Sequence, residues 1–251
     1  MENSDDYFFS TDINSAMSNI NLPKVFHQIW LGESIIPHLL VKYSVTWRNN
    51  HLDWNFCLWD DKKSRVLIEE KYPDLLLKYD SLPFLTQRVD IIKYVVLYEY
   101  GGVYLDFDCE CLRPIDNLLT HPICLGLEPR EEDLHKEFPF FLGSAFMATI
   151  PNTYFFSTTI DRCQQQLELL TPKWQELSKY YYVMETTGPT LLNRVYQDFN
   201  EKESVKLLPP EQIGPFRSRE ATLYRENKKL GYGKDKLVDA YAIHHFIGSW
   251  L

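Results

Sequence analysis

The sequence lacks the long apolar runs that mark membrane spans and secretion signals. No stretch approaches the ~18 consecutive apolar residues of a membrane-spanning helix, so we expect no transmembrane segment. Residues 1–21 are polar and acidic, without the apolar centre of a signal peptide. We interpret them as an N-terminal lead-in to a single domain at residues 22–251.

Cysteine is present without a pattern that would build a disulfide framework or a structural zinc site. The chain has five cysteines, an odd number, and no two are spaced as CxxC. They are Cys57, Cys109, Cys111, Cys124 and Cys163. Reduced and mostly buried thiols are the simplest interpretation, and they indicate a cytoplasmic location.

Basic residues are in short supply. The 26 Lys and Arg face 35 Asp and Glu, which gives a net charge of -9. A general nucleic-acid binder needs a basic face, so we expect no nucleic-acid partner. Residues 217–236 are the exception, with a local charge of +4. This segment, with Gly231 and Gly233 as hinges, could close over a bound phosphate group, although a solvated basic surface explains it equally well.

The chain does contain short apolar runs that alternate with helical patterns. Residues 24–30 and 54–59 are bounded by turn or acidic residues and predict buried strands, each followed by a helical pattern. This order favours an α/β fold with a mostly parallel central sheet flanked by helices. Further strands are expected at 103–107, 122–128, 140–149, 205–208 and 240–251, and further helices at 87–100, 153–170 and 189–199.

Residues 86–116 combine a helix, a double glycine and an acidic strand end. We expect a helix capped by Thr86 and ended by Gly101 and Gly102, followed by a strand that carries Asp106 and Asp108. In a continuing strand these two carboxylates point to the same side and need a compensating cation. Oxygen ligands of this kind suit Mn²⁺ or Mg²⁺. On spacing alone, two solvated aspartates explain the pattern equally well.

Other polar residues near this stretch have both a functional and a structural interpretation. Asp90 and Lys93 lie one helical turn apart and can pair, with Arg88 nearby. A surface ion pair is the simpler explanation. His245 could add a nitrogen ligand to a metal, although a histidine in a strand is more often structural.

Residues 88–108 resemble the DXD-containing glycosyltransferase sugar-binding family. That family includes fungal α-1,6-mannosyltransferases, inositol-phosphoceramide mannosyltransferases and bacterial polysaccharide transferases, and it is distantly similar to the glucosylating domains of large bacterial toxins. Other segments match in the same order, and the resemblance covers residues 22–251. These segments are residues 23–30, 56–60, 187–189 and 245–250.

The resemblance implies a GT-A fold, which is Rossmann-like, and a nucleotide-sugar held by Mn²⁺ or Mg²⁺. Asp108 is implied to ligate the metal, with His245 and Ser249 as further ligands. Asp106 is implied to hold the ribose and the sugar, and Asp90 the hydroxyls of the donor sugar. These implied roles make Asp90, Asp106 and Asp108 the candidate catalytic residues.

The resemblance also implies a set of contacts to the donor. Tyr104 is expected beside the nucleotide and Trp250 over the diphosphate. Lys93 stands where the family usually has arginine, so it keeps the charge and loses the two-pronged geometry. The full set of implied donor-binding residues is Gln28, Trp30, Arg88, Asp90, Lys93, Tyr104, Asp106, Ser249 and Trp250.

The predicted activity is a metal-dependent, retaining transfer of a hexose from a UDP- or GDP-sugar to a glycan, lipid or protein acceptor. The donor base, the sugar and the acceptor stay open. One alternative is a metal-dependent phosphoesterase or nucleotide-sugar hydrolase that uses the same carboxylates. The other is a non-catalytic carbohydrate-binding relative.

Overall fold

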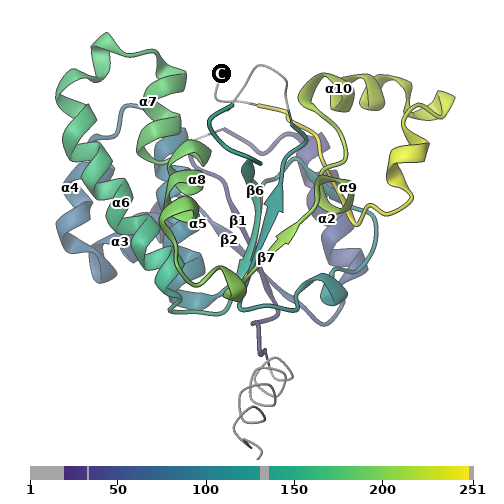
Figure 1. Ribbon diagram of the computed structural model, residues 1–251, viewed down its shortest axis with the longest axis horizontal. Coiled ribbons are helices and arrows are strands. Elements are labelled where there is room, and N and C mark those ends of the chain that lie inside the picture. The colour runs from purple at the N-terminus through teal and green to yellow at the C-terminus, as the bar shows by residue number, and fades with distance from the viewer. Residues whose placement is uncertain (1–19, 33, 131–135, 249–251) are drawn as a thin grey trace, which may run out of the picture.

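A six-stranded sheet runs through the centre of the molecule (Figure 1). The computed structural model describes residues 20–32, 34–130 and 136–248. The strand order is β2-β1-β3-β6-β5-β7, and every pair is parallel except the two that β6 makes with β3 and β5. The strands are β1 (Val25–Ile29), β2 (Asn55–Trp59), β3 (Gly102–Leu105), β5 (Ile123–Leu127), β6 (Leu142–Thr149) and β7 (Val205–Leu208). The α/β class with a mostly parallel sheet is confirmed.

Helices cover both faces of this sheet, as Figure 1 shows. One face carries α3 (Asp61–Lys71), α4 (Pro73–Ser81), α5 (Leu85–Tyr100), α6 (Tyr154–Leu170), α7 (Lys179–Thr186) and α8 (Pro189–Asp198). On the other side lie α2 (His38–Asn50), α9 (Pro210–Ile213) and α10 (Ser218–Asn227). Short 3-10 turns are η2 (Asp116–Leu118), η3 (Thr171–Glu176), η4 (Lys202–Ser204), η5 (Lys228–Leu230) and η6 (Lys234–Leu237). A second, antiparallel sheet pairs β4 (Cys109–Cys111) with β8 (Ala242–His244).

The sheet separates two apolar cores because successive side chains of a strand point to opposite faces. In β3, Tyr104 joins the core beneath α5, α6 and α8, whereas Val103 and Leu105 join the core that contains Trp47 of α2. All four residues of β3 are buried. A strand covered on both faces reads as a continuous apolar run, which is how residues 103–105 appear in the sequence.

The double glycine between α5 and β3 is required by the space available and by the backbone. Gly101 and Gly102 have φ angles of 63° and 88°, a region that side chains with a Cβ rarely adopt. A Cβ on Gly102 would also lie 2.5 Å from the carbonyl oxygen of Val25. The prediction that these glycines end the helix is confirmed.

Several expected boundaries are wrong in detail. Helix α5 begins at Leu85 after an N-cap at Phe84 that makes no side-chain bond, so Thr86 lies inside the helix and does not cap it. The strand expected to end at residue 107 ends at Leu105, because the chain turns there. In the C-terminal strand-like stretch, β8 covers residues 242–244 of the described chain. The helices α4, α7, α9 and α10 were not predicted.

The structure also bears on the expectations for membrane spans and for cysteines. Among the described residues, no helix combines the length and the apolar character that crossing a bilayer requires. All five thiols are free, and four of them are buried. The cytoplasmic location and the division between residues 21 and 22 stay predictions, and residues 1–19 lie outside the described part of the chain.

Candidate active site

The acidic pair sits in a tight turn directly after β3. The amide of Asp106 donates to the carbonyl of Ala145 at 3.0 Å, which is the last backbone bond before the chain leaves the sheet. The amide of Cys109 then donates to the carbonyl of Asp106 at 3.1 Å and closes the turn. The residue that follows the acidic pair is fixed by Trp47, whose indole N–H donates to the carbonyl of Cys109 at 2.8 Å. The two aspartates therefore meet across a turn and not along a strand.

The small β4–β8 sheet brings the C-terminal segment to this turn. Cys109 pairs with His244 in the antiparallel register. The Asp108 carbonyl accepts from the amide of His245 at 3.0 Å, and its carboxylate accepts from the amide of Ile247 at 2.7 Å. Asp108 is thus fixed by the backbone of a segment that lies more than a hundred residues away in the sequence.

Three side chains converge as a potential metal site. One ligand atom from each of Asp106, Asp108 and His244 lies within 4.8 Å of the other two. The His244 Nε2 lies 3.5 Å from the Asp108 carboxylate. Two carboxylates and one imidazole are a reasonable ligand set for a divalent cation, with room for further oxygen ligands.

A buried polar network lies beside this group and reaches it through Tyr104. The Lys93 ammonium contacts Asp90 at 2.9 Å and the Ser144 hydroxyl at 3.2 Å. It also lies 5.0 Å from the centre of the Tyr104 ring. The Tyr104 hydroxyl donates to the carboxylate of Asp106. Lys93 and Asp106 therefore belong to one connected set of groups, and their donor-binding roles stay predictions.

Asp90 has a second partner from the 187–189 motif. The Thr187 hydroxyl donates to the Asp90 carboxylate at 2.9 Å, and the Thr187 carbonyl accepts from the Tyr94 hydroxyl at 2.8 Å. Gly188 is the N-cap of α8. Residues 187–189 match one of the family segments, and the sequence assigned them no role. The structure places them against the donor-binding candidate Asp90.

Charge around Lys93 keeps it protonated. Burial lowers the pKa of Lys93, and the nearby carboxylates of Asp90 and Asp106 raise it by more, so the net shift is upward. The ion pair between Lys93 and Asp90 is almost fully buried. A surface ion pair, the simpler explanation for these two residues, is therefore wrong.

His245 faces away from the carboxylate pair. Its Nε2 donates to the Glu110 carboxylate at 3.0 Å, and its ring stacks on Tyr43 with 4.2 Å between ring centres. Burial lowers the pKa of His245. Its Nδ1 is buried without a hydrogen-bond partner in the described chain. The group that converges with the aspartates contains His244, and the metal role predicted for His245 stays a prediction.

The remaining candidate residues occupy varied positions. Gln28 is buried and accepts from the Ser44 hydroxyl at 2.5 Å. Trp30 packs edge-on against Phe107, with ring centres 5.6 Å apart, and so lies beside the acidic turn. Ser249 and Trp250 lie outside the described residues.

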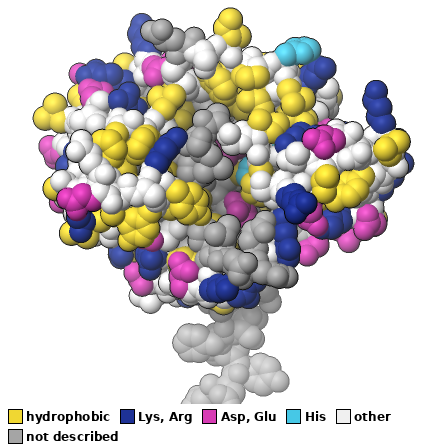
Figure 2. Space-filling view, turned by 90° about the horizontal axis from the view of Figure 1, so that it is seen from above, with side chains coloured by type: hydrophobic (Ala, Val, Ile, Leu, Met, Phe, Trp, Pro, Cys, Tyr) yellow, Lys and Arg dark blue, Asp and Glu magenta, His cyan; other side chains and the backbone are white. Residues whose placement is uncertain are grey.

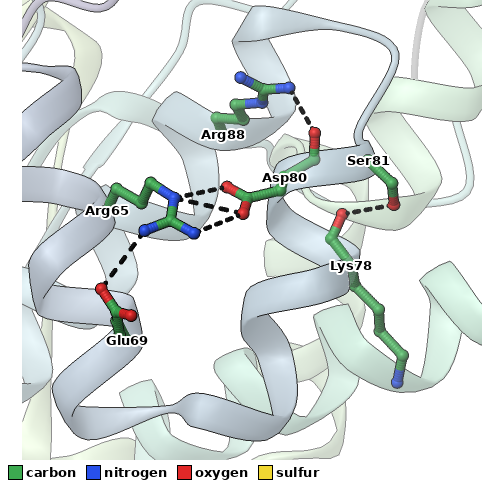
Figure 3. Close-up of polar contacts among 6 residues, drawn as sticks. All are labelled: Arg65, Glu69, Lys78, Asp80, Ser81 and Arg88. Carbon is green, nitrogen blue, oxygen red and sulfur yellow. Dashed lines mark hydrogen bonds and ion pairs between the residues drawn. The ribbon is translucent and has the colours of Figure 1, made fainter.

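Arg88 is held at the other side of α5. Its guanidinium donates to the backbone carbonyl of Asp80 at 2.8 Å, as Figure 3 shows. The Asp80 side chain binds Arg65 in the same region. Arg88 therefore ties α5 to the end of α4, and the structure gives it no contact with the acidic group. Its donor-binding role stays a prediction.

The acidic turn opens on a hollow surface. Parallel strands β1, β2 and β3 end at the same edge of the sheet, where ligands of open α/β folds bind. Figure 2 looks down on this end and shows acidic and histidine side chains at the bottom of a depression. The arrangement allows a ligand to reach the carboxylates from outside.

Sequence reasoning missed three residues of this arrangement. His244 has the same residue type as its neighbour, and only its register against β4 distinguishes the two. Thr187 carried a signal, since it opens a motif that matches the family. Ser144 carried none, because a serine within an apolar strand is common and its contact with Lys93 depends on β6 lying beside β3.

Comparison with known proteins supports the family resemblance. Residues 37–124 match the family model described as the glycosyltransferase sugar-binding region containing DXD motif. Inositol phosphoceramide mannosyltransferase 2 of Schizosaccharomyces pombe is 29% identical over 190 residues, covering 76% of this chain and 50% of that protein. Inositol phosphoceramide mannosyltransferase 3 of the same yeast is 40% identical over 101 residues, covering 40% of this chain and 28% of that protein. The family resemblance is confirmed, and the chain spans half or less of the length of these two relatives.

A solved structure supports the fold. The UDP-bound glycosyltransferase domain from the YGT toxin superimposes with a TM-score of 0.54, covering 87% of this chain and 90% of that chain. The sequences are 9% identical, so the likeness concerns the fold alone. The expected GT-A fold is confirmed.

Proposed function

The chain carries the sugar-binding region of a DXD glycosyltransferase family, and we propose that it is a metal-dependent, retaining hexosyltransferase that uses a nucleotide-sugar donor. The convergence of Asp106, Asp108 and His244 at the carboxyl edge of the sheet carries the proposal. The acceptor is a glycan, lipid or protein. The names of the two yeast relatives favour mannose as the first donor sugar to test and a lipid as the first acceptor.

The three converging side chains fit a divalent cation. Asp106 and Asp108 lie close together, and within the described chain the Tyr104 hydroxyl donates to the first carboxylate and the amide of Ile247 to the second. A cation removes the repulsion that remains. Carboxylates suit Mg²⁺ and Mn²⁺, and the imidazole favours Mn²⁺ of the two. When bound, the ion supplies Lewis-acid stabilisation of the charge on a leaving diphosphate.

In this proposal Asp90 and Lys93 hold the donor sugar. One carboxylate oxygen of Asp90 contacts Lys93 and the other contacts Thr187, and a second lone pair on each oxygen can accept from a sugar hydroxyl. Lys93 stays protonated and brings positive charge to an otherwise acidic site. Because both groups are buried and fixed, they lose little freedom when a sugar binds.

Retention of configuration follows from the family resemblance. Asp106 and Asp108 are occupied as ligands in this proposal, and Asp90 is occupied by Lys93. We assign the role of nucleophile to no further carboxylate of the described residues. We therefore favour a displacement in which the acceptor attacks from the face that the diphosphate leaves.

Substitution of Asp108 by asparagine tests the proposal. Asp108→Asn keeps the size of the side chain and the acceptor for Ile247, and it removes the negative charge. We expect transfer or slow hydrolysis of nucleotide-sugars in Mn²⁺ to fall by on the order of a hundredfold or more, with an unchanged melting temperature. Asp74→Asn is the matched control, since Asp74 is exposed and makes no ion pair within the described part of the chain. Full activity of Asp108→Asn would exclude the metal role.

The products separate the proposal from its alternatives. A transferase that meets water in place of its acceptor releases a nucleoside diphosphate and a free hexose. A phosphoesterase releases a nucleoside monophosphate and a sugar phosphate from the same donor. A non-catalytic binding protein leaves the donor intact and binds sugar without Mn²⁺.

A further inference from the structure

The junction between α7 and α8 is held against α5 by three buried hydrogen bonds. The side-chain amide of Gln87 donates to the Thr186 hydroxyl at 2.8 Å. The Thr187 hydroxyl donates to the Asp90 carboxylate at 2.9 Å, and the Tyr94 hydroxyl donates to the Thr187 carbonyl at 2.8 Å. Residues 87, 90 and 94 lie on one face of α5, because they are spaced by three and by four. Figure 1 shows all three helices on the same side of the sheet.

The backbone of Thr187 is fixed at both of its polar groups. Its amide donates to the carbonyl of Val183 at 3.1 Å, and its carbonyl accepts from Tyr94. The following residue is Gly188, where an added Cβ would lie 2.9 Å from the Cα of Met184. The turn is therefore tight, and the Thr187 hydroxyl reaches Asp90 from a fixed position.

The Asp90 carboxylate is consequently held at both oxygens. Lys93 contacts one oxygen at 2.9 Å, and Thr187 contacts the other at 2.9 Å. The plane of a carboxylate rotates easily about its terminal torsion. Lys93 belongs to the same helix as Asp90, whereas Thr187 belongs to a separate element. The contact with Thr187 therefore fixes the plane of the carboxylate relative to the rest of the molecule.

This arrangement uses polar groups where apolar ones would pack as well. Asp90 is 4% exposed, and Tyr94 and Thr187 are not exposed at all. A buried polar network is weak evidence of extra stability, because apolar side chains of similar volume often replace it without loss. It does impose one geometry on its members. A fixed geometry is what a group that binds a sugar hydroxyl requires, since a small displacement costs much of its effect.

We propose that Thr187 is a positioning residue for the donor sugar, whose hydroxyl orients the Asp90 carboxylate toward the hydroxyls of that sugar. The inference rests on the proposed function, in which Asp90 holds the donor sugar. Thr187 acts through Asp90 alone. Its loss should therefore weaken recognition of the sugar and leave recognition of the nucleoside diphosphate as it is.

Isothermal titration calorimetry in Mn²⁺ separates these two parts of the donor. The probes are GDP-mannose against GDP, and UDP-glucose, UDP-galactose and UDP-N-acetylglucosamine against UDP. The quantity compared is the Kd of the nucleotide-sugar divided by the Kd of its nucleoside diphosphate. Thr187→Val keeps the shape of the side chain and removes the hydroxyl, and we expect it to raise this ratio by on the order of tenfold. Thr187→Ser retains the hydroxyl and should keep the wild-type ratio.

Thr159→Val is the matched control. Thr159 is also fully buried, and its hydroxyl donates to the carbonyl of Phe155 at 2.8 Å within α6. The variant loses one buried hydrogen bond without touching Asp90, so the ratio should stay at its wild-type value. Tyr94→Phe is a second route to the same junction, since it releases the carbonyl of Thr187 and keeps the ring. It should raise the ratio by a smaller factor, and it carries the test if circular dichroism shows that Thr187→Val is unfolded.

The possible failures are distinguishable. A wild-type ratio in both Thr187→Val and Tyr94→Phe would overturn the positioning role while the proposed function stands. An equal rise in Thr159→Val would overturn it as well, and so would equal weakening of both ligands of a pair, which indicates a general distortion of the site. A wild-type protein that binds none of the four nucleotide-sugars would overturn the proposed function, and this inference with it.

Discussion

Acidification should destabilise this protein through His27, a buried histidine at the junction that leads to the acidic turn. The His27 Nε2 lies 2.9 Å from the carbonyl oxygen of Gly101, and its Nδ1 lies 3.1 Å from the indole nitrogen of Trp59. A carbonyl only accepts and an indole N–H only donates, so the neutral ring donates from Nε2 and accepts at Nδ1. A second proton would place two donors against each other.

The size of the effect follows from the pKa of His27. Burial lowers it from 6.5 to about 4, although the bond to Gly101 opposes the shift. Between these values the unfolded chain binds a proton that the folded chain does not, so unfolding becomes easier as the pH falls from 6.5 to about 4. At ~1.4 kcal/mol for each unit of pKa, His27 removes about 3 kcal/mol of stability over this range.

Urea unfolding at pH 7.5 and at pH 4 measures this contribution. The reference is His27→Gln, whose amide can replace both hydrogen bonds and does not titrate. Buried His51 and His245 also have lowered pKa values, and they cancel because both proteins contain them. The wild-type free energy of unfolding should fall by about 3 kcal/mol more than that of His27→Gln.

A parallel loss of stability in the two proteins would contradict this contribution of His27. Titration of His27 near 6.5 in the folded protein, followed by NMR, would contradict it equally. His38→Gln is the control, because His38 is exposed at the start of α2 and its replacement leaves both hydrogen bonds of His27 in place.

Two further substitutions test the structure around the site. Gly102→Ala should cost about 2–4 kcal/mol in urea unfolding, because its φ is 88° and the new Cβ would lie 2.5 Å from the Val25 carbonyl; a loss under about 1 kcal/mol would contradict the described junction. Lys93→Met should cost about 3–5 kcal/mol, since it leaves the buried Asp90 carboxylate without its cation. Lys71→Met, at an ion pair exposed on the surface, should cost less than about 1 kcal/mol.

The stretch from α5 to the acidic turn could be predicted because its signals are local. An apolar helical face, two glycines and an apolar run each specify their own conformation within a few residues. The exact end of β3 could not be predicted, since the residues up to Phe107 suit a strand equally well. The chain leaves the sheet at Asp106 because β4 pairs with β8, whose residues lie more than a hundred positions later.

The choice between His244 and His245 shows the same limit at the level of one residue. Neighbours in a strand point to opposite sides, so one histidine of the pair faces the carboxylates and the other faces away. Which one does so depends on the register against β4, and a shift of one residue would exchange them. Cys109 pairs with His244, which sends His245 toward Glu110 and Tyr43. No pattern within residues 240–251 fixes that register.

The charges of residues 217–236 also acquire meaning only in three dimensions. In the sequence they form one basic run of +4 that could close over a phosphate. In the fold, Lys228 and Arg225 are engaged by Glu110 and by the carbonyl of His245, so they stabilise the β4–β8 sheet. A closing motion of this segment would have to break those contacts first. Lys229 and Lys234 have no acidic partner among the described residues, and Glu226 and Asp235 of the same run have no basic one, so this half of the run is an exposed surface of mixed charge.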